Sequence, residues 1–195
     1  MRTNQLTDKD IETVMNYIDN NGKNSLRDRA IVNLSLKAGL RTTYIADLKI
    51  ADVLDETGQI RDELAIGNQV VFLNKQVRDD LANYLEHRFD RSLKSIVLLN
   101  TMFSNHLYPL HLFENRKRGY FDRNTLPAYI RSIYLRAGVK NISGSSARAT
   151  YIRKLAESGL SLAQMSKLSG FSVERIAQLV LSPTTTNERA VIEQM

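Results

Sequence analysis

Apolar residues near the start of the chain recur with the period of an α-helix. Positions 11, 14, 15 and 18 fall on one helical face, and Thr7 or Asp8 is placed to cap that helix. A second apolar stripe begins at Ser25, and Gly39 lies at its C-terminal end. The pattern predicts three helices, over 7–19, from 25 to 39 and over 43–48.

The pattern changes between residues 50 and 73. Short apolar groups, the first of them Val53-Leu54, are separated by turn signals at Glu56-Thr57-Gly58 and Gly67-Asn68. This alternation predicts a small antiparallel sheet of two or three strands. Asn74 is then placed to cap a helix that continues through position 85, and a less regular stretch runs through Pro109 to position 113.

The C-terminal half carries helical patterns only. Glycines at 138, 159 and 170 separate the predicted helices, which cover about 124–137, 145–157, 161–170 and 172–181. The predicted fold class is therefore mainly α with one small antiparallel β-sheet. We expect one domain over 1–182 and a C-terminal tail over 183–195.

Charge is distributed unevenly along the chain. The formal net charge is +6, and residues 116–154 contain ten basic side chains against a single acid, Asp122. Residues 52–63 instead contain five acids and one base. A one-sided basic region favours a polyanionic partner, because neutralised phosphates release counterions.

The composition excludes several kinds of site. The chain has no cysteine, so disulfides, thiolate chemistry and cysteine-type zinc sites are ruled out. Its histidines, at 87, 106 and 111, are scattered, and we expect no metal and no cofactor. The N-terminus is polar and the longest apolar runs are too short to span a bilayer. We therefore expect a cytoplasmic protein with no membrane partner.

Three segments, taken together, resemble a known family. They are 27–53, which contains Gly39-Leu40-Arg41, then 112–139, and finally 145–172, which contains Ser145-Ser146-Ala147-Arg148. In order and spacing they are similar to the motifs of the tyrosine recombinase catalytic domain, in the phage integrase family. The resemblance covers about 25–181 and implies the DNA breaking-rejoining fold.

The resemblance places Arg41 and Arg148 at the family's two arginine positions. In such enzymes a tyrosine attacks the scissile phosphorus, and the two arginines neutralise the transition state. Because a guanidinium can bind a phosphate through two hydrogen bonds, we expect Arg41 and Arg148 to bind the DNA backbone. The structural alternative is that either arginine makes an internal salt bridge or caps a helix.

Other positions depart from the family's pattern. Residues of another type stand where histidines and the nucleophilic tyrosine are expected: Ser145, Ala149 and Phe171 at the histidines, and Val180 at the nucleophile. Tyr44 replaces an acid often found three residues after the first arginine. No tyrosine follows Tyr151, which we expect to pack in the core. We therefore expect no catalytic residues and no enzyme activity.

These observations lead to the expectation of a double-stranded-DNA-binding protein. It would be a transcriptional regulator, or an accessory factor in DNA recombination or integration, of a phage, plasmid or other mobile genetic element. The additional candidate DNA contacts are Arg116, Lys117, Arg118 and Arg123, with Arg153 and Lys154 ranked lower. Only about 24 residues precede the first motif, so we expect no separate core-binding domain. Homo-oligomers through the tail are an accompanying hypothesis.

Three alternatives remain open. The chain is an active site-specific recombinase if its nucleophile comes from a partner or from an unrecognised position. Residues 160–181 also fit an ordinary helix-turn-helix, in which Glu174, Arg175 and Gln178 would contact DNA. The last alternative is an interaction module that binds a recombinase rather than DNA.

Overall fold

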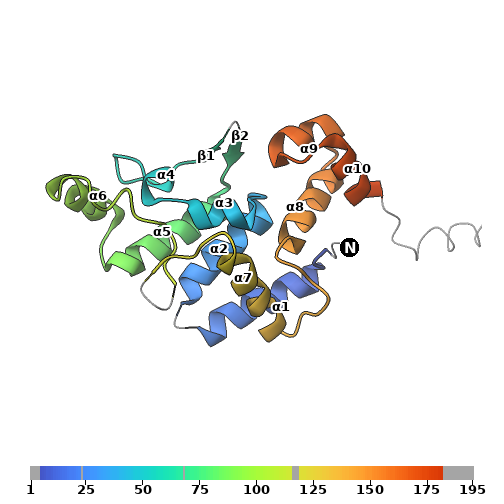
Figure 1. Ribbon diagram of the computed structural model, residues 1–195, viewed down its shortest axis with the longest axis horizontal. Helices are drawn as coiled ribbons and strands as arrows, with labels where there is room; N and C mark the ends of the chain where they lie inside the picture. The colour runs from blue at the N-terminus through green and yellow to red at the C-terminus, as the bar shows by residue number, and fades with distance from the viewer. Residues whose placement is uncertain (1–4, 23, 68, 116–118, 182–195) are drawn as a thin grey trace, which may run out of the picture. The chain divides into compact units, whose positions relative to one another are not determined.

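The computed structural model describes residues 5–22, 24–67, 69–115 and 119–181 (Figure 1). In chain order the elements are α1 (Asp8–Asn21), α2 (Ser25–Lys37), α3 (Thr42–Asp47), α4 (Ile50–Val53), β1 (Glu63–Ile66), β2 (Gln69–Phe72), α5 (Lys75–Phe89), α6 (Leu93–Met102), α7 (Thr125–Arg136), α8 (Ser146–Glu157), α9 (Leu162–Ser169) and α10 (Val173–Leu181). This mainly helical fold with one small antiparallel sheet confirms the predicted fold class. Within the described ranges, no helix is both long and apolar enough to cross a membrane.

The chain forms two compact units, Met1–Tyr151 and Ile152–Met195. In the first unit α2 packs against α1, α3 and α5 (Figure 1). Its consecutive residues Ala30, Ile31 and Val32 are all buried, as are Leu34 and Leu36. Because α2 is buried on most sides, it has no separate apolar face, and it also buries the polar side chains of Arg27, Asn33 and Ser35. It forms the centre of this unit's core.

Side-chain caps fix two helix starts where the sequence predicted them. The Thr7 hydroxyl accepts a hydrogen bond from the Asp10 backbone N–H (3.1 Å), and the Asp10 carboxylate accepts one from the Thr7 N–H (2.9 Å). The Asn74 side chain likewise accepts from the Val77 N–H (3.0 Å) at the start of α5. Each cap satisfies backbone donors that have no partner inside the helix.

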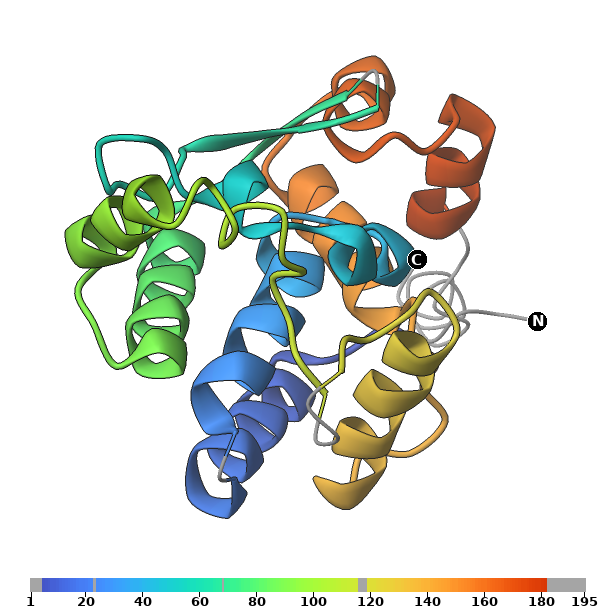
Figure 2. The same cartoon turned by 60° about the vertical axis from the view of Figure 1, so that its left-hand side comes forward.

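The sheet consists of β1 and β2, which pair antiparallel as a hairpin (Figure 2). Leu64 pairs with Val71 and both are buried, while Glu63 and Phe72, the neighbouring pair, are exposed. Two strands agree with the predicted sheet of two or three. The apolar pair Val53-Leu54 adds no full strand, because Val53 ends the short helix α4 and Leu54 forms only an isolated antiparallel bridge with Ile60. A hydrogen bond from the Lys49 N–H to the Asp52 carboxylate (2.8 Å) favours a helical turn at this point.

Helix α6 was not predicted, since its sequence lay in the stretch described as less regular. Ser92 caps it by accepting a hydrogen bond from the Ser95 N–H (3.4 Å). Of its apolar residues Ile96 is buried, whereas Leu98 and Met102 are 61% and 68% exposed. With apolar residues on its exposed side as well, α6 lacks the clear amphipathic stripe that reveals a helix in a sequence.

The second unit contains the end of α8 together with α9 and α10, which pack against each other. Ser161 starts α9 with a capping box to Gln164. Gly170 ends α9 with φ 64°, a left-handed conformation that glycine adopts readily. The Ser166 hydroxyl donates to the Phe171 carbonyl (2.7 Å) and closes the turn before α10.

Candidate nucleic-acid interface

The turn between α2 and α3 determines where Arg41 lies. Gly39 has φ 68°, and the Leu40 N–H donates to the Leu34 carbonyl (3.1 Å), so the chain folds back over the end of α2. Leu40 is buried as a result, and the next residue, Arg41, is exposed at the start of α3. The sequence Gly-Leu-Arg thus fixes a turn, an anchor in the core and an arginine at the surface.

Arg148 lies on α8 and contacts the same turn. Its side chain is only 6% exposed, and its Nε donates a hydrogen bond to the Gly39 carbonyl (2.8 Å). Burial, and then the positive charge of Arg41, lower the pKa of Arg148 to about 10. The side chain therefore remains cationic at neutral pH, in a place where its charge is destabilised. The structure brings the two predicted arginines together.

The first turns of α8 are fixed tightly in the first unit. Ala147, Ala149 and Thr150 are buried on either side of Arg148. The Thr150 hydroxyl accepts a hydrogen bond from the Leu6 N–H (2.7 Å) and so joins α8 to the segment before α1. Because these neighbours leave α8 little freedom, the position of Arg148 is fixed by core packing as well as by Gly39.

Tyr151 explains why position 39 is glycine. A Cβ atom at Gly39 would lie 2.4 Å from two atoms of the Tyr151 ring, a separation that real side chains do not tolerate. Burial raises the pKa of the Tyr151 hydroxyl. Tyr151 thus packs directly against the turn that carries Arg41, in agreement with the packing role expected from the sequence.

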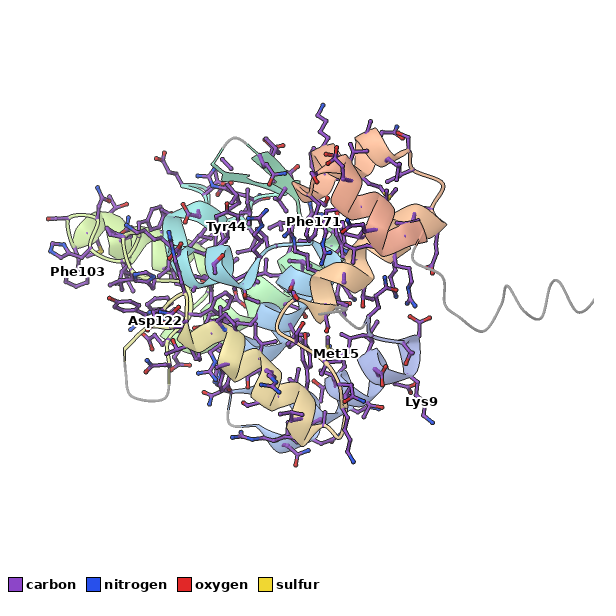
Figure 3. The ribbon with its side chains drawn as sticks, turned by 45° about the vertical axis from the view of Figure 1, so that its right-hand side comes forward. Lys9, Met15, Tyr44, Phe103, Asp122 and Phe171 are labelled. Atoms are coloured by element: carbon purple, nitrogen blue, oxygen red, sulfur yellow. The ribbon has the colours of Figure 1, made fainter. Side chains whose placement is uncertain are left out.

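Tyr44 lies on α3, the helix that begins directly after Arg41 (Figure 3). The guanidinium carbon of Arg41 lies 5.8 Å from the centroid of the Tyr44 ring, within the range of a cation–π interaction. Tyr44 also interacts electrostatically with Arg148 and acts to raise its pKa. The sequence pointed to Tyr44 only as the replacement of an acid, because its interaction with Arg148 joins residues that are far apart in the sequence.

The remaining positions named from the resemblance are divided between the two units. Ser145 is exposed immediately before α8, and its hydroxyl lies 2.9 Å from the Ser143 hydroxyl, while Ala149 is buried. Phe171 and Val180 belong to the second unit, after α9 and within α10. Each of these two side chains is half-buried.

The basic residues predicted as further DNA contacts have different surroundings. Arg123 forms an ion pair with Asp47 at the end of α3 (2.7 Å), and its side chain is 69% exposed. Arg153 pairs with Glu157 one turn along α8 (3.4 Å), and Lys154 is exposed. Three further predictions, Arg116, Lys117 and Arg118, lie outside the described residues, as does the predicted tail over 183–195.

Sequence reasoning missed two buried arginines that fix the segment leading to residues 116–118. Arg27 forms an ion pair with Asp28 (2.8 Å) and donates to the Glu114 carbonyl (2.8 Å). Arg88 donates to the carbonyls of His111 (2.8 Å) and Leu112 (2.9 Å). Except for Asp28, which directly follows Arg27, these partners lie far away along the chain, so no local spacing reveals them.

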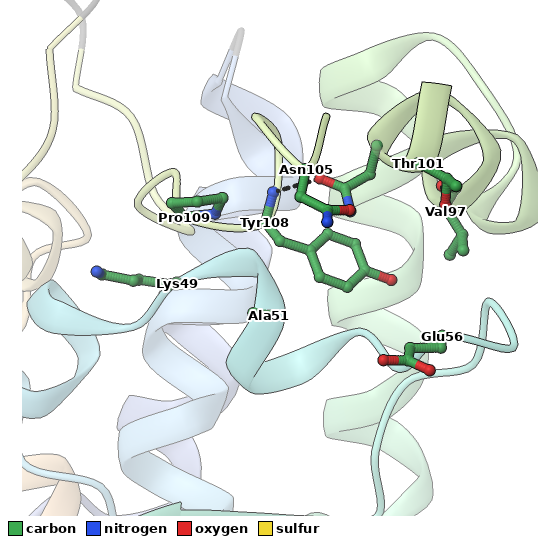
Figure 4. A pocket seen from close by; sticks show the side chains of 9 residues that line it. Lys49, Ala51, Glu56, Val97, Thr101, Asn105, Tyr108 and Pro109 are labelled. Atoms are coloured by element: carbon green, nitrogen blue, oxygen red, sulfur yellow. Dashed lines mark hydrogen bonds between the residues drawn. The ribbon is translucent and has the colours of Figure 1, made fainter. Parts of the chain in front are cut away.

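A separate pocket of about 700 Å³ lies between α4, α6 and the loop that follows α6 (Figure 4). Its polar lining already has a structural role, because the Asn100 side-chain oxygen accepts hydrogen bonds from the N–H groups of Leu107 (3.0 Å) and Tyr108 (2.9 Å). Among the described residues, no three His, Asp or Glu side chains form a group that could hold a metal ion. The arginine pair is therefore the better candidate site.

Comparison with known proteins identifies the family. The model of the phage integrase family matches residues 4–179. This chain belongs to that family. A phage integrase relative, "Tyrosine recombinase XerD" of Rickettsia prowazekii (strain Madrid E), is 27% identical over 173 residues, which cover 82% of this chain and 52% of the relative. The chain thus spans about half the length of this curated relative.

Solved structures of integrases and recombinases share the fold. The crystal structure of XerA recombinase matches with a TM-score of 0.71 and 17% identity, over 100% of this chain and 64% of that one. The Tn1549 transposon integrase, in complex with a circular intermediate DNA, matches with a TM-score of 0.68 and 14% identity, over 100% of this chain and 67% of that one. At such low identities these likenesses show the fold.

One expectation from the sequence is corrected by these comparisons. The expectation that the chain is not an enzyme is wrong, because the chain belongs to the phage integrase family and a curated relative is named a tyrosine recombinase. That expectation was drawn from the residue types at Ser145, Ala149, Phe171 and Val180. Residue types at single positions do not show a loss of activity.

Proposed function

We propose that this phage integrase family member binds duplex DNA by holding a backbone phosphate between Arg41 and Arg148. In this role it serves a mobile element as a transcriptional regulator or as an accessory factor in recombination. The observation that carries the proposal is the buried Arg148 cation, whose Nε is held by the Gly39 carbonyl and whose pKa is lowered by Arg41.

The electrostatics favour an anion over an internal ion pair, which was one of the two structural alternatives for Arg148. An ion pair with a carboxylate would hold the pKa of Arg148 up, whereas the pKa is lowered to about 10. A buried cation beside a second cation is stabilised when an anion binds between them. The guanidinium group suits phosphate because it presents several N–H donors in one plane.

The partner is supported by two further observations. The chain carries a net charge of +6, and ten of its basic residues fall between 116 and 154. The matching structures of the Tn1549 integrase and of XerH recombinase are complexes with DNA. Since phosphate contacts carry no sequence information by themselves, the arginine pair would supply affinity and orientation, while other residues select the site.

Site-specific strand cleavage and rejoining is the second candidate, and the family membership favours it. In this case the same two arginines would neutralise the pentacoordinate phosphorus, and the nucleophile would come from a partner or from an unrecognised position. Incubation with nicked duplexes, followed by denaturing electrophoresis, separates the candidates. A covalent protein–DNA adduct supports cleavage, and non-covalent binding alone supports the regulator or accessory role.

The DNA site is identified by a binding selection. The purified chain is mixed with sheared DNA of its source at physiological salt, and the bound fragments are sequenced. We expect enrichment of a defined site, such as an inverted repeat. No enrichment above background would contradict a sequence-selective regulator.

Arg175→Ala, on α10, is the comparison variant for Arg41→Ala. Arg175 is exposed and donates to the Gln178 side chain (3.2 Å), at a position where a helix-turn-helix would contact DNA. The proposal predicts that Arg41→Ala weakens binding to every duplex. If Arg41→Ala binds normally and Arg175→Ala abolishes binding, the helix-turn-helix explanation replaces ours.

A further inference from the structure

Tyr44 differs from the other residues of α3 in where its side chain lies. Ile45 and Ala46 are buried in the core, whereas Tyr44 is 37% exposed. Tyr44 follows Arg41 by three residues, and its N–H donates to the Arg41 carbonyl (2.9 Å). Residues three apart on a helix lie on the same side, so the Arg41 guanidinium and the Tyr44 ring are neighbours, 5.8 Å apart.

The ring contact has a consequence for Arg41. An exposed arginine samples many rotamers, and binding a ligand normally requires the loss of that freedom. A cation–π contact with Tyr44 restricts the guanidinium before any ligand arrives. A single exposed aromatic residue is ordinary on a protein surface, so this contact alone assigns no ligand to Tyr44.

A second observation links Tyr44 to the phosphate clamp, which is the pair Arg41 and Arg148. The Tyr44 phenol acts on the Arg148 guanidinium, raising the pKa of Arg148 against the effects of burial and of Arg41. Tyr44 therefore interacts with both arginines, one through its ring face and one electrostatically. An anion bound between the two positive charges would therefore also lie near Tyr44.

The chemistry of a phenol suits this place better than that of a carboxylate. In the resemblance described above, an acid often stands at this position, where it would neutralise an arginine and repel a phosphate. A tyrosine hydroxyl is neutral at pH 7 and donates one hydrogen bond. Donation to a charged phosphate oxygen gives a charge-assisted hydrogen bond, which is stronger than one between neutral groups.

We propose that Tyr44 is a third ligand of the phosphate, donating its hydroxyl hydrogen bond to the anion that Arg41 and Arg148 hold. The proposal rests on the phosphate clamp of the proposed function. The Tyr44 hydroxyl would add one neutral contact to the two charged contacts of the arginines. An acidic residue at this position could not donate such a hydrogen bond to a phosphate.

The test compares Tyr44→Phe with the wild-type chain in binding to a fluorescein-labelled duplex of mixed sequence, across a range of salt concentrations. Removing one hydrogen bond to a charged group should weaken binding by roughly tenfold. The slope of log affinity against log salt should not change, because a neutral hydroxyl releases no counterion. The ring contact with Arg41 is retained in this variant.

The matched control is Tyr17→Phe on α1, where a half-buried tyrosine packs against the core. It should bind DNA like the wild type. Thermal unfolding of both variants should match that of the wild type, since the Tyr44 side chain is exposed and the Tyr17 side chain is only half-buried. An equal loss of affinity in Tyr17→Phe would overturn the proposal, because the effect would then not be specific to position 44.

Two further outcomes distinguish this proposal from the clamp itself. If Tyr44→Phe binds like the wild type while Arg41→Ala and Arg148→Ala bind weakly, the clamp stands and the third ligand is refuted. If neither arginine variant weakens binding, the clamp fails, whatever Tyr44→Phe does. Tyr44→Leu, which removes ring and hydroxyl together, should bind more weakly than Tyr44→Phe, and equal binding would refute the stacking contribution.

Discussion

Two arginines of the first unit are almost equally buried but lie in opposite electrostatic surroundings. Arg27 is 5% exposed, forms an ion pair with Asp28 (2.8 Å) and donates to the Tyr129 hydroxyl (2.6 Å). Arg148 is 6% exposed, and burial together with Arg41 lowers its pKa to about 10. The first has the environment of a structural cation, the second that of a binding site. Replacing each arginine by methionine tests this difference.

The expected effect of Arg148→Met follows from the sign of the pKa change. A lowered pKa means that the folded state destabilises the cation, and the drop from 12.5 to about 10 corresponds to at most roughly 3 kcal/mol in favour of a neutral side chain. Against this gain, the buried Gly39 carbonyl loses its donor, which costs about 1–3 kcal/mol. The two effects largely offset, so the free energy of unfolding should change by less than about 2 kcal/mol.

Arg27→Met should behave differently. Removing one partner of a buried ion pair leaves the other charge without compensation, which lowers the free energy of unfolding by about 3–5 kcal/mol. The Glu114 carbonyl and the ring of Phe121, whose centroid is 5.3 Å from the guanidinium, also lose their contacts. Arg27→Met is thus the internal standard for a structural arginine.

The assay is urea unfolding followed by circular dichroism, with DNA binding measured on the same preparations. We expect Arg148→Met to remain folded and to bind DNA weakly, which is the behaviour of a side chain kept for its ligand rather than for stability. If Arg148→Met loses as much stability as Arg27→Met, then Arg148 is a structural anchor and the reasoning behind the clamp is refuted.

Three other substitutions follow from particular contacts. Gly39→Ala should lower the free energy of unfolding by more than about 1 kcal/mol, because φ is 68° and the new Cβ would meet the Tyr151 ring. Combining Gly39→Ala with Tyr151→Ala should recover part of that loss. If the two losses simply add in thermal unfolding, the predicted clash is contradicted. Asp47→Asn releases the exposed Arg123 from its ion pair, so DNA binding should tighten. The slope of log affinity against log salt should steepen by up to about one. Unchanged affinity at low salt would show that Arg123 does not contact DNA. Thr150→Val removes the hydroxyl that accepts a hydrogen bond from the buried Leu6 N–H, and it should lower the free energy of unfolding in urea by about 1–3 kcal/mol. Thr150→Ser keeps the hydroxyl and should retain most of the stability. Equal losses in the two variants would show that packing matters instead of the hydrogen bond.

Helices with local signals could be predicted from the sequence. The Thr7 cap and the Asn74 cap both form as expected, since capping depends on residues three positions apart. Helix α6 escaped prediction because its apolar residues lie on exposed as well as buried sides. The short helix α4 escaped it because an apolar pair such as Val53-Leu54 fits either a strand or a helical turn. Local patterns thus identified elements that carry their own boundary signals.

The candidate site shows the same division. The resemblance named Arg41 and Arg148, which the structure places around one turn. The contacts of Tyr44 with Arg148 and of Arg27 with Glu114 join residues far apart in the sequence, so spacing does not reveal them. The mistaken expectation about enzyme activity came from treating four single positions, Val180 among them, as decisive. The family match, by contrast, extends over residues 4–179 and does not depend on any single position.

The central claim is that Arg41 and Arg148 both contact a DNA phosphate. It is tested most directly by the salt dependence of duplex binding for the wild type, Arg41→Ala and Arg148→Ala. Our account predicts that each substitution weakens binding to every sequence and makes the slope of log affinity against log salt shallower by about one. Full wild-type slopes in both variants would contradict the account.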